Sequence, residues 1–215
     1  NKFSDKSYEE FMSSMEDLQK QGLQQLVLDL RGNGGGFMNE AVDMADEFLD
    51  GDKLVVYMKG AKTKKTEYRC KRPGLLEKGK LVVLVDELSA SASEVLAGAL
   101  QDWCRAKIIG RRTFGKGLVQ QQYPLSDGAA LRLTIARYYT PTGRSIQKPY
   151  ENYKEYTMDI INRYNKGELS NKDSIHFPDS LRYKTLVNQR TVYGGGGIMP
   201  DLFIPLDTTK YTDYY

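Results

Sequence analysis

The residues best suited to chemistry are the serines of Ser89 to Glu94 (SASASE), a short segment between two apolar stretches. The stretch before it, Leu81 to Val85, predicts a buried strand, and the stretch after it has helical spacing. A serine at such a turn projects above the carboxyl edge of a parallel sheet, where the free amides of a helix start can stabilise an oxyanion. The alternative is that the serines only cap the helix.

A serine becomes nucleophilic at neutral pH only beside a base, and the chain offers two candidates. His176 lies in a polar stretch without a motif around it, which disfavours a Ser-His-Asp triad. Lys116 lies among glycines and apolar residues in Phe114 to Gln120 (FGKGLVQ), where burial would favour the uncharged amine that a base requires. Gln120 carries a neutral amide that can orient this amine. The alternative for Lys116 is an ordinary surface lysine.

Three short patterns suggest other chemistry, and each departs from its motif. The run from Gly110 to Lys116 spells GxxxxGK, but Gly117 replaces the hydroxyl residue that holds magnesium and a predicted strand follows. A P-loop nucleotide binder is therefore a minor alternative. Ser145 to Lys148 matches SxxK, but the adjacent proline and turn disfavour the helix this motif needs. Gly32 to Gly36 lacks the third glycine of a dinucleotide-binding turn, so a turn with exposed amides fits better.

The remaining pattern predicts an α/β core followed by a more β-rich half. A Ser-x-x-Glu capping box at Ser7 and helical spacing predict a first helix that ends at Gly22. Period-two alternation from Leu118 onward predicts strands, and one helix is expected near Tyr153 to Tyr164. Further strands are predicted at Leu26 to Leu30, Leu54 to Tyr57, Leu81 to Val85 and Lys107 to Gly110, and further helices at Ala41 to Leu49 and Ser89 to Cys104. We expect a mixed, largely parallel sheet flanked by helices.

Composition narrows the function classes. The chain has 31 Lys and Arg against 28 Asp and Glu, and a net charge of +3 is too small for a dedicated nucleic-acid binder. The basic stretch Lys59 to Arg72 fits a solvated hairpin whose edge strand is protected by lysines. No apolar run approaches the roughly 20 residues of a membrane span. One histidine and two cysteines, Cys70 and Cys104, exclude a His-rich or Cys-rich zinc site and permit one disulfide or none.

Five separate segments resemble the C-terminal processing proteases, a family of serine peptidases with a Ser-Lys dyad. They occur in the family's order: Leu28 to Gly36, Val85 to Glu94, Ala99 to Asp102, Gly115 to Gln120 and Gly197 to Asp201. The resemblance implies that the nucleophile is Ser91, that the base is Lys116, 25 residues on, and that Gln120 assists the lysine.

The resemblance also implies the remaining parts of the site. Its oxyanion donors would be the amide of Ala92 and that of Gly35 or Gly36. Asp102 matches a family aspartate, which we interpret as structural because a charged carboxylate beside the lysine would weaken the base. Neither a metal nor a cofactor is expected.

On the scale of the whole protein, the resemblance implies a ClpP/crotonase-like core that cleaves proteins near C-termini with apolar tails. It implies a location outside the cytoplasm, in the bacterial periplasm or cell envelope, and leaves homo-oligomers open. It covers about residues 1–150 and 190–206, so we interpret 1–215 as one catalytic core with a family-variable insertion at 151–192. The family usually carries a PDZ domain, and a strand ahead of Asn1, so we expect an N-terminally incomplete piece. The alternative is a catalytically silent peptide-binding or scaffold module.

Overall fold

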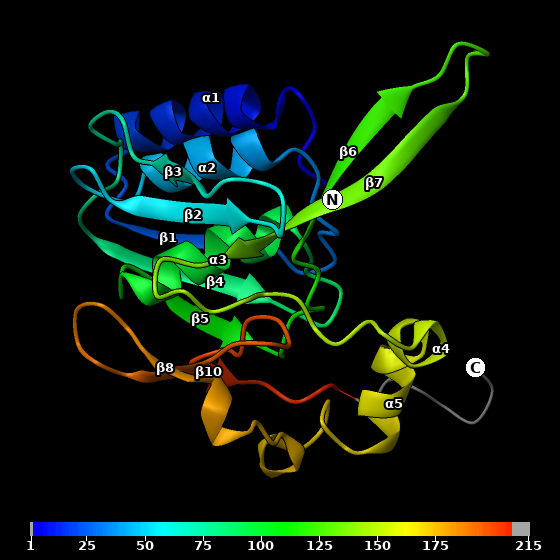
Figure 1. The fold of residues 1–215 in the computed structure, drawn as a ribbon. Coiled ribbons are helices and arrows are strands. Elements are labelled where there is room, and N and C mark those ends of the chain that lie inside the picture. Colours follow the sequence, from blue (N-terminus) through cyan, green and yellow to red (C-terminus); the bar gives the residue numbers. More distant parts are fainter. Residues whose placement is uncertain (1, 208–215) are drawn as a thin grey trace, which may run out of the picture.

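The computed structural model describes residues 2–207, and its centre is a parallel sheet (Figure 1). The strands of this sheet follow the order β1 (Gln25–Asp29), β4 (Lys80–Val85), β5 (Lys107–Gly110) and β10 (Leu202–Phe203). All three pairings are parallel, so the carboxyl ends of the strands meet at one edge. The predicted largely parallel sheet is confirmed, and loops that follow β1, β4 and β5 are brought together at that edge.

A second, antiparallel sheet combines the hairpin predicted from Leu118 onward with two strands from the first half of the chain. Its strands follow the order β3 (Thr66–Arg69), β2 (Leu54–Lys59), β7 (Ala130–Tyr139) and β6 (Leu118–Pro124). The strand predicted at Leu54 therefore pairs with β3 and β7 and lies outside the parallel sheet. The basic stretch Lys59 to Arg72 contains β3 as an edge strand, as its lysines predicted. A two-stranded sheet of β8 (Arg182–Lys184) and β9 (Thr191–Tyr193) completes the strands of the described residues.

Three helices pack on this framework, and two short helices lie apart from it (Figure 1). They are α1 (Ser7–Lys20), α2 (Met38–Asp46) and α3 (Ala92–Asp102), then α4 (Tyr153–Thr157) and α5 (Asp159–Asn165), with short 3-10 turns at Lys172–Ser174 and Asp179–Leu181. The capping box predicted at Ser7 is wrong, because Lys6 is the N-cap and Ser7 is already helical. The single helix predicted near Tyr153 to Tyr164 is divided at Met158. Among the described residues, no helix has the length and apolar character needed to cross a membrane.

Helix α3 is the central helix of the fold, since every one of its residues is buried. It packs against α2 and β2, and its side chains Val95, Leu96 and Leu100 belong to the main hydrophobic core. Burial of whole aliphatic side chains of this kind contributes about 2 kcal/mol each. The residue at the start of α3 is therefore carried by one of the least movable elements of the molecule.

The hairpin of β6 and β7 is the opposite case, since it projects away from the body (Figure 1). Leu131 and Leu133 on β7 are 46% and 44% exposed, although their alternation with polar residues is typical of a half-buried strand. Period two predicted the strand correctly. It could not predict that no other layer covers the apolar side of its outer half.

Candidate active site

Three loops form the site at the carboxyl edge of the parallel sheet. The first follows β1 and contains Gly35 and Gly36, the second follows β4 and contains Ser91, and the third runs from β5 to Lys116. Because β1, β4 and β5 are neighbours and parallel, their ends place these loops side by side. Segments far apart in the sequence are thus joined by topology alone.

Ser91 occupies a strained backbone position directly before α3. Its φ of 56° and ψ of −114° fall in a region that residues other than glycine rarely adopt, and such conformations cost about 1–3 kcal/mol. Gly35 lies against it: a Cβ on Gly35 would come within 2.7 Å of the Ser91 Cβ and 2.5 Å of the Ala90 carbonyl oxygen. The close approach of the two loops therefore requires glycine at position 35.

Of the three serines in the SASAS run, only Ser91 is partly exposed. Ser89 and Ser93 are fully buried and have structural partners. The Ser89 hydroxyl donates to the Leu30 carbonyl at 2.8 Å, and the Ser93 hydroxyl donates to the Asn33 carbonyl at 2.9 Å. These bonds tie the serine turn to the glycine turn after β1. Ser91 is thus the serine that a substrate can reach.

Two backbone amides of these loops, those of Ala92 and Gly36, donate no hydrogen bond among the described residues. Ala92 is the first residue of α3, so its N–H has no acceptor within the helix. The N–H of Gly35 donates to the Asn33 side-chain oxygen at 3.0 Å, and Gly35 is buried. Gly36 is exposed, and among the described residues its N–H donates to no acceptor. The geometry therefore favours Gly36 over Gly35 as the partner of Ala92.

Glu94 connects the serine turn to the lysine loop. Its carboxylate is fully buried and accepts hydrogen bonds from the backbone amides of Ser91 (2.8 Å), Gly115 (2.7 Å) and Lys116 (2.8 Å). The Thr113 hydroxyl donates to the same carboxylate at 2.5 Å. Burial raises the pKa of Glu94, while these four bonds oppose the shift by favouring the ionised form. One side chain thus fixes the backbone of both proposed dyad residues.

Lys116 lies at the site, but its side chain is exposed. The expectation that it is buried among apolar groups is therefore wrong for the chain as described. Among the described residues, no hydrogen bond joins the Lys116 amine to Ser91. Gln120 is also exposed, on β6, where its backbone faces Thr134. The structure brings Ser91, Ala92, Gly36 and the Lys116 backbone together, and leaves the lysine head and Gln120 in solvent.

The competing motifs are placed elsewhere or lack their required elements. After Gly117 the chain enters strand β6, so the helix that a P-loop needs is replaced by a strand. Ser145 to Lys148 is not helical, and the Lys148 ammonium pairs with Asp159 at 2.9 Å. Asp102 is fully buried and pairs with Arg144 at 2.6 Å, which agrees with its interpretation as a structural residue.

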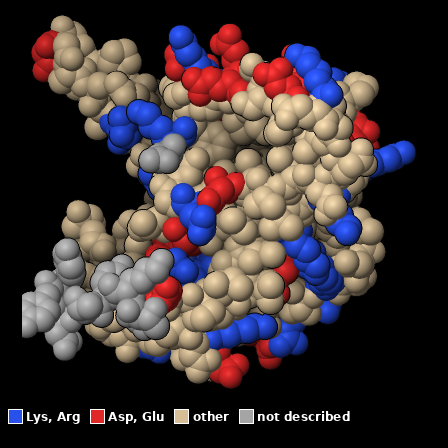
Figure 2. Space-filling model, turned by 180° about the vertical axis from the view of Figure 1, so that it is seen from behind, with Lys and Arg blue, Asp and Glu red and all other residues tan. Residues whose placement is uncertain are grey.

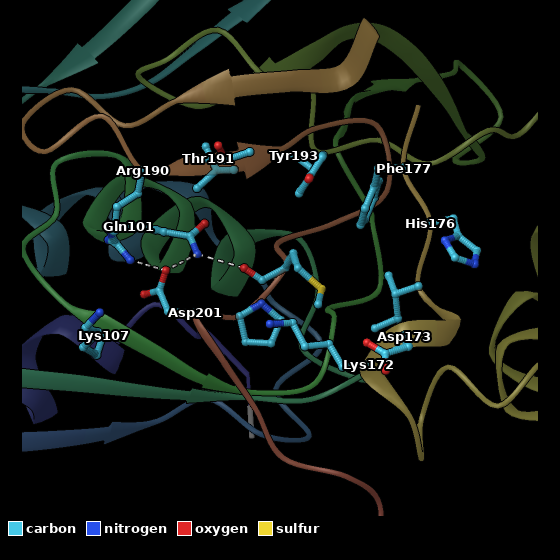
Figure 3. Close-up of a pocket in the computed structure, with 14 residues that line it drawn as sticks. Gln101, Lys107, Lys172, Asp173, His176, Phe177, Arg190, Thr191, Tyr193 and Asp201 are labelled. Atoms are coloured by element: carbon cyan, nitrogen blue, oxygen red, sulfur yellow. Dashed lines mark hydrogen bonds and ion pairs between the residues drawn. The ribbon is translucent and has the colours of Figure 1, made fainter. Parts of the chain in front are cut away.

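His176 lines a different pocket, of about 620 Å³, beyond the C-terminal end of α3 (Figure 3). In Figure 3 it lies across this pocket from Gln101, Asp201 and Arg190, which are linked to one another. Ser91 directly precedes α3 and Gln101 lies near its end, so the pocket and the serine are at opposite ends of the helix. This placement argues against His176 as the base for Ser91.

Neither a patch of one charge on the rear face nor a candidate metal cluster is found in the described part of the chain. Figure 2 shows basic and acidic side chains intermixed over the rear face, around the hollow below the projecting hairpin. Residues 2–207 contain no group of three or more His, Cys, Asp or Glu side chains that could hold a metal ion. Both cysteines are free, and burial, with smaller contributions from Asp46, raises the pKa of Cys70 to about 12.

Comparison with known proteins assigns the class. The family model described as peptidase family S41 matches residues 1–161, and the chain therefore belongs to this family. Among its relatives is a carboxyl-terminal-processing protease of Picosynechococcus, 42% identical over 158 residues, or 69% of this chain and 35% of the relative. A carboxy-terminal-processing protease of Bartonella bacilliformis is 37% identical over 186 residues, or 79% of this chain and 43% of the relative. The chain thus spans well under half the length of these relatives.

A solved structure agrees in fold over nearly the whole chain. The photosystem II D1 C-terminal processing protease superposes with a TM-score of 0.68 at 30% identity, and covers 95% of this chain and 40% of its own. A putative S41 protease of Bacteroides fragilis, at 18% identity and a TM-score of 0.56, covers 78% of this chain and 53% of its own, and supports the fold alone. The predicted mixed α/β class and the family resemblance are both confirmed.

Sequence reasoning missed the role of Glu94 and of Asn33. Glu94 was included in the family motif without a role of its own, although Ser91 and Glu94 have the Ser-x-x-Glu spacing of a capping box. That spacing predicts the bond to the Ser91 amide, and only the fold reveals the bonds to Gly115 and Lys116. Asn33 offered no pattern, because its partners Ala90 and Ser93 lie about 60 residues away.

Proposed function

We propose that this chain is the catalytic core of a serine endopeptidase that cleaves proteins near their C-termini through Ser91 and Lys116. The observation that carries the proposal is the meeting of Ser91, two free amides and the Lys116 backbone around Glu94, at one edge of the sheet. A reactive hydroxyl beside unpaired amides is the arrangement that acyl transfer requires.

In the proposed reaction, the uncharged Lys116 amine takes the proton of the Ser91 hydroxyl as its oxygen attacks the scissile carbonyl. The amides of Ala92 and Gly36 hold the resulting oxyanion. The tetrahedral intermediate collapses to an acyl-enzyme, and the leaving amine receives the proton from Lys116. A water then attacks the ester, with Lys116 as base again, and releases the peptide acid and Ser91.

Because the Lys116 side chain is exposed, the proposal requires the substrate itself to shield the lysine amine from water. A peptide laid between the serine turn and β6 would displace water from the lysine head and favour its uncharged form. By family resemblance, the substrates are proteins with apolar C-terminal tails, met outside the cytoplasm. Gln120 would then orient the amine from β6. Apo geometry that is looser than the working geometry is common in such sites.

The test is peptide cleavage together with labelling by a fluorophosphonate serine probe, in the intact protein. Ser91→Ala and Lys116→Ala should each reduce cleavage by at least about 1,000-fold while the unfolding temperature stays unchanged. Ser126→Ala, an exposed serine in the turn between β6 and β7, is the matched control and should retain both cleavage and labelling. Normal turnover by either dyad variant would refute the proposal.

The exposure of Lys116 favours one alternative, a catalytically silent module that binds peptides with the same fold. The same experiment separates the two functions. A silent module would bind tail peptides in a titration without cleaving them, and its Ser91 would not react with the probe.

A further inference from the structure

Arg163 is a buried arginine just outside the residues that the family model matches. It lies on α5, just beyond the matched residues 1–161, and its side chain is only 3% exposed. Arginine is rarely buried unless its donors are satisfied. Here Nη1 donates to the Thr113 carbonyl oxygen at 3.0 Å and Nη2 donates to the Arg112 carbonyl oxygen at 2.5 Å. Both acceptors belong to the loop that leads from β5 to Lys116.

Lys148 contacts the same loop from the same side. Its backbone amide donates to the Gly115 carbonyl at 3.0 Å, and its ammonium lies 3.8 Å from the centre of the Phe114 ring. The ammonium also pairs with Asp159, the first residue of α5, at 2.9 Å, and lies 4.5 Å from the ring centre of Tyr156 on α4. Helices α4 and α5 thus reach the loop through side chains on both.

The opposite side of the loop is held by Glu94 on α3. That carboxylate binds the amides of Gly115 and Lys116 and the hydroxyl of Thr113, as described above. The loop is therefore held between a family element, α3, and a segment that carries none of the family motifs. Since the Lys116 side chain is exposed, the direction in which it leaves the loop depends on this backbone.

The cost of burying Arg163 argues that it has a positional task. Its Nε has no hydrogen-bond partner among the described residues, and the nearest carboxylate oxygen, on Glu168, lies 3.6 Å away. Burial, with the neighbouring Arg112 as a second cause, lowers the pKa of Arg163 to about 10. Apolar residues often replace buried charges without loss of stability. The guanidinium therefore contributes little to the stability of the fold. Its main effect is to fix the position of the loop backbone, because its two Nη groups fit two successive carbonyl oxygens.

We propose that α5 supports the lysine loop from behind and that Arg163 is a positioning residue for Lys116, an inference that rests on the proposed dyad. In this proposal, the first half of the 151–192 segment, which carries no family motif, positions the lysine loop. It holds the carbonyls of Arg112 and Thr113 so that the amides of Gly115 and Lys116 face Glu94.

The test compares Arg163→Met with Arg163→Lys in the intact protein. Methionine keeps the length and apolar stem but cannot donate, whereas lysine keeps the charge and one bond to the loop. We expect Arg163→Met to reduce kcat by about 100-fold with KM changed by less than about threefold, since small misplacements of a catalytic group have effects of this size. Arg163→Lys should recover part of the loss. Arg182→Met, which removes an exposed arginine paired with Asp179 in the same segment, should match the wild type.

A second readout does not depend on catalysis. Hydrogen exchange at the amides of Gly115 and Lys116 should accelerate at least about tenfold in Arg163→Met, while exchange within α3 stays unchanged. Unchanged exchange at these two amides would overturn the inference, as would wild-type kcat. If Arg163→Met fails to fold, Arg163→Lys, which keeps one bond to the loop, should still accelerate exchange at these two amides, by a smaller factor, and unchanged exchange would again overturn the inference.

The two proposals fail in different ways. If Lys116→Ala cleaves peptides normally, the dyad is wrong whatever Arg163 does. If Lys116→Ala is inactive but Arg163→Met is fully active with protected loop amides, the dyad stands and the positioning role is refuted.

Discussion

The serine turn and the lysine loop share one carboxylate, but they are built differently. Ser91 directly precedes a helix that is buried along its whole length, and its backbone, with a φ of 56°, lies against Gly35 and donates to Glu94. Lys116 lies two residues before the exposed strand β6, and its amide donates to Glu94 on α3, while Arg163 holds the loop that leads to it. The proposed nucleophile is thus held by the core, while the proposed base depends on long-range contacts and on what covers it.

Among changes outside the proposed dyad, the largest effect should come from Glu94→Gln, which breaks the link between the two regions. A glutamine has one acceptor oxygen, and its NH₂ group would face backbone donors that now point at a carboxylate. We expect about 3 kcal/mol lower free energy of unfolding and at least about 100-fold slower cleavage. Denaturant unfolding and peptide cleavage measure the two.

The control is Glu10→Gln, an exposed glutamate on α1, which should change neither quantity. Wild-type cleavage by Glu94→Gln would mean that the two regions keep their geometry without the shared carboxylate. In that case other contacts would have to hold the serine turn and the lysine loop in place.

A next smaller effect is expected from Gly35→Ala, which acts on the serine side alone. The added Cβ would meet the Ala90 carbonyl oxygen at 2.5 Å, on a backbone with φ of +90°. The turn must shift away from Ser91, so we expect a loss of about 2 kcal/mol in stability and slower labelling by a fluorophosphonate probe.

Gly34→Ala is the matched control for this change. Its Cβ would enter open space and its φ is not positive, so the free energy of unfolding should change by less than about 0.5 kcal/mol. Equal labelling rates in the two variants would show that the serine turn tolerates displacement and that the core does not hold Ser91 in one geometry.

The smallest effect is predicted for Gln120→Ala, on the exposed side of the lysine loop. Losing the neutral hydrogen bond that Gln120 is proposed to make to the amine in the substrate complex should slow cleavage by about tenfold, with no change in the unfolding temperature because the side chain is exposed. Gln122→Ala, two residues along the same exposed strand, serves as control. If both variants cleave like the wild type, the base works without an orienting amide.

The sequence predicted the serine side of the site better than the lysine side, for a physical reason. The apolar run Leu81 to Val85 and the helical spacing after Ser91 are local patterns, so they placed the turn correctly at the end of β4. The burial of Lys116 was inferred from apolar neighbours in the chain, such as Leu118 and Val119. Those neighbours begin a hairpin that leaves the body, so local composition could not report the exposure of the lysine.

The same distinction explains the errors in the fold. The run from Leu54 to Tyr57 is a strand as predicted, but its letters do not reveal its partners, which are antiparallel β3 and β7. The bonds from Arg163 to Arg112 and Thr113 span about 50 residues, and no pattern in the sequence announces them. Periodicity specifies elements, whereas pairing and long-range bonds depend on the folded whole.

The backbone conformation of Ser91 also limits how the thermal stability of this protein could be increased by mutation. Glycine adopts its φ and ψ freely, so Ser91→Gly removes a backbone penalty of about 1–3 kcal/mol, against which stands only a small, half-exposed side chain. Directed evolution that selects for heat resistance alone would therefore favour loss of the hydroxyl. Mutant libraries that are selected for higher thermal stability should therefore keep Ser91 unchanged, or should be screened for peptide cleavage as well as for stability.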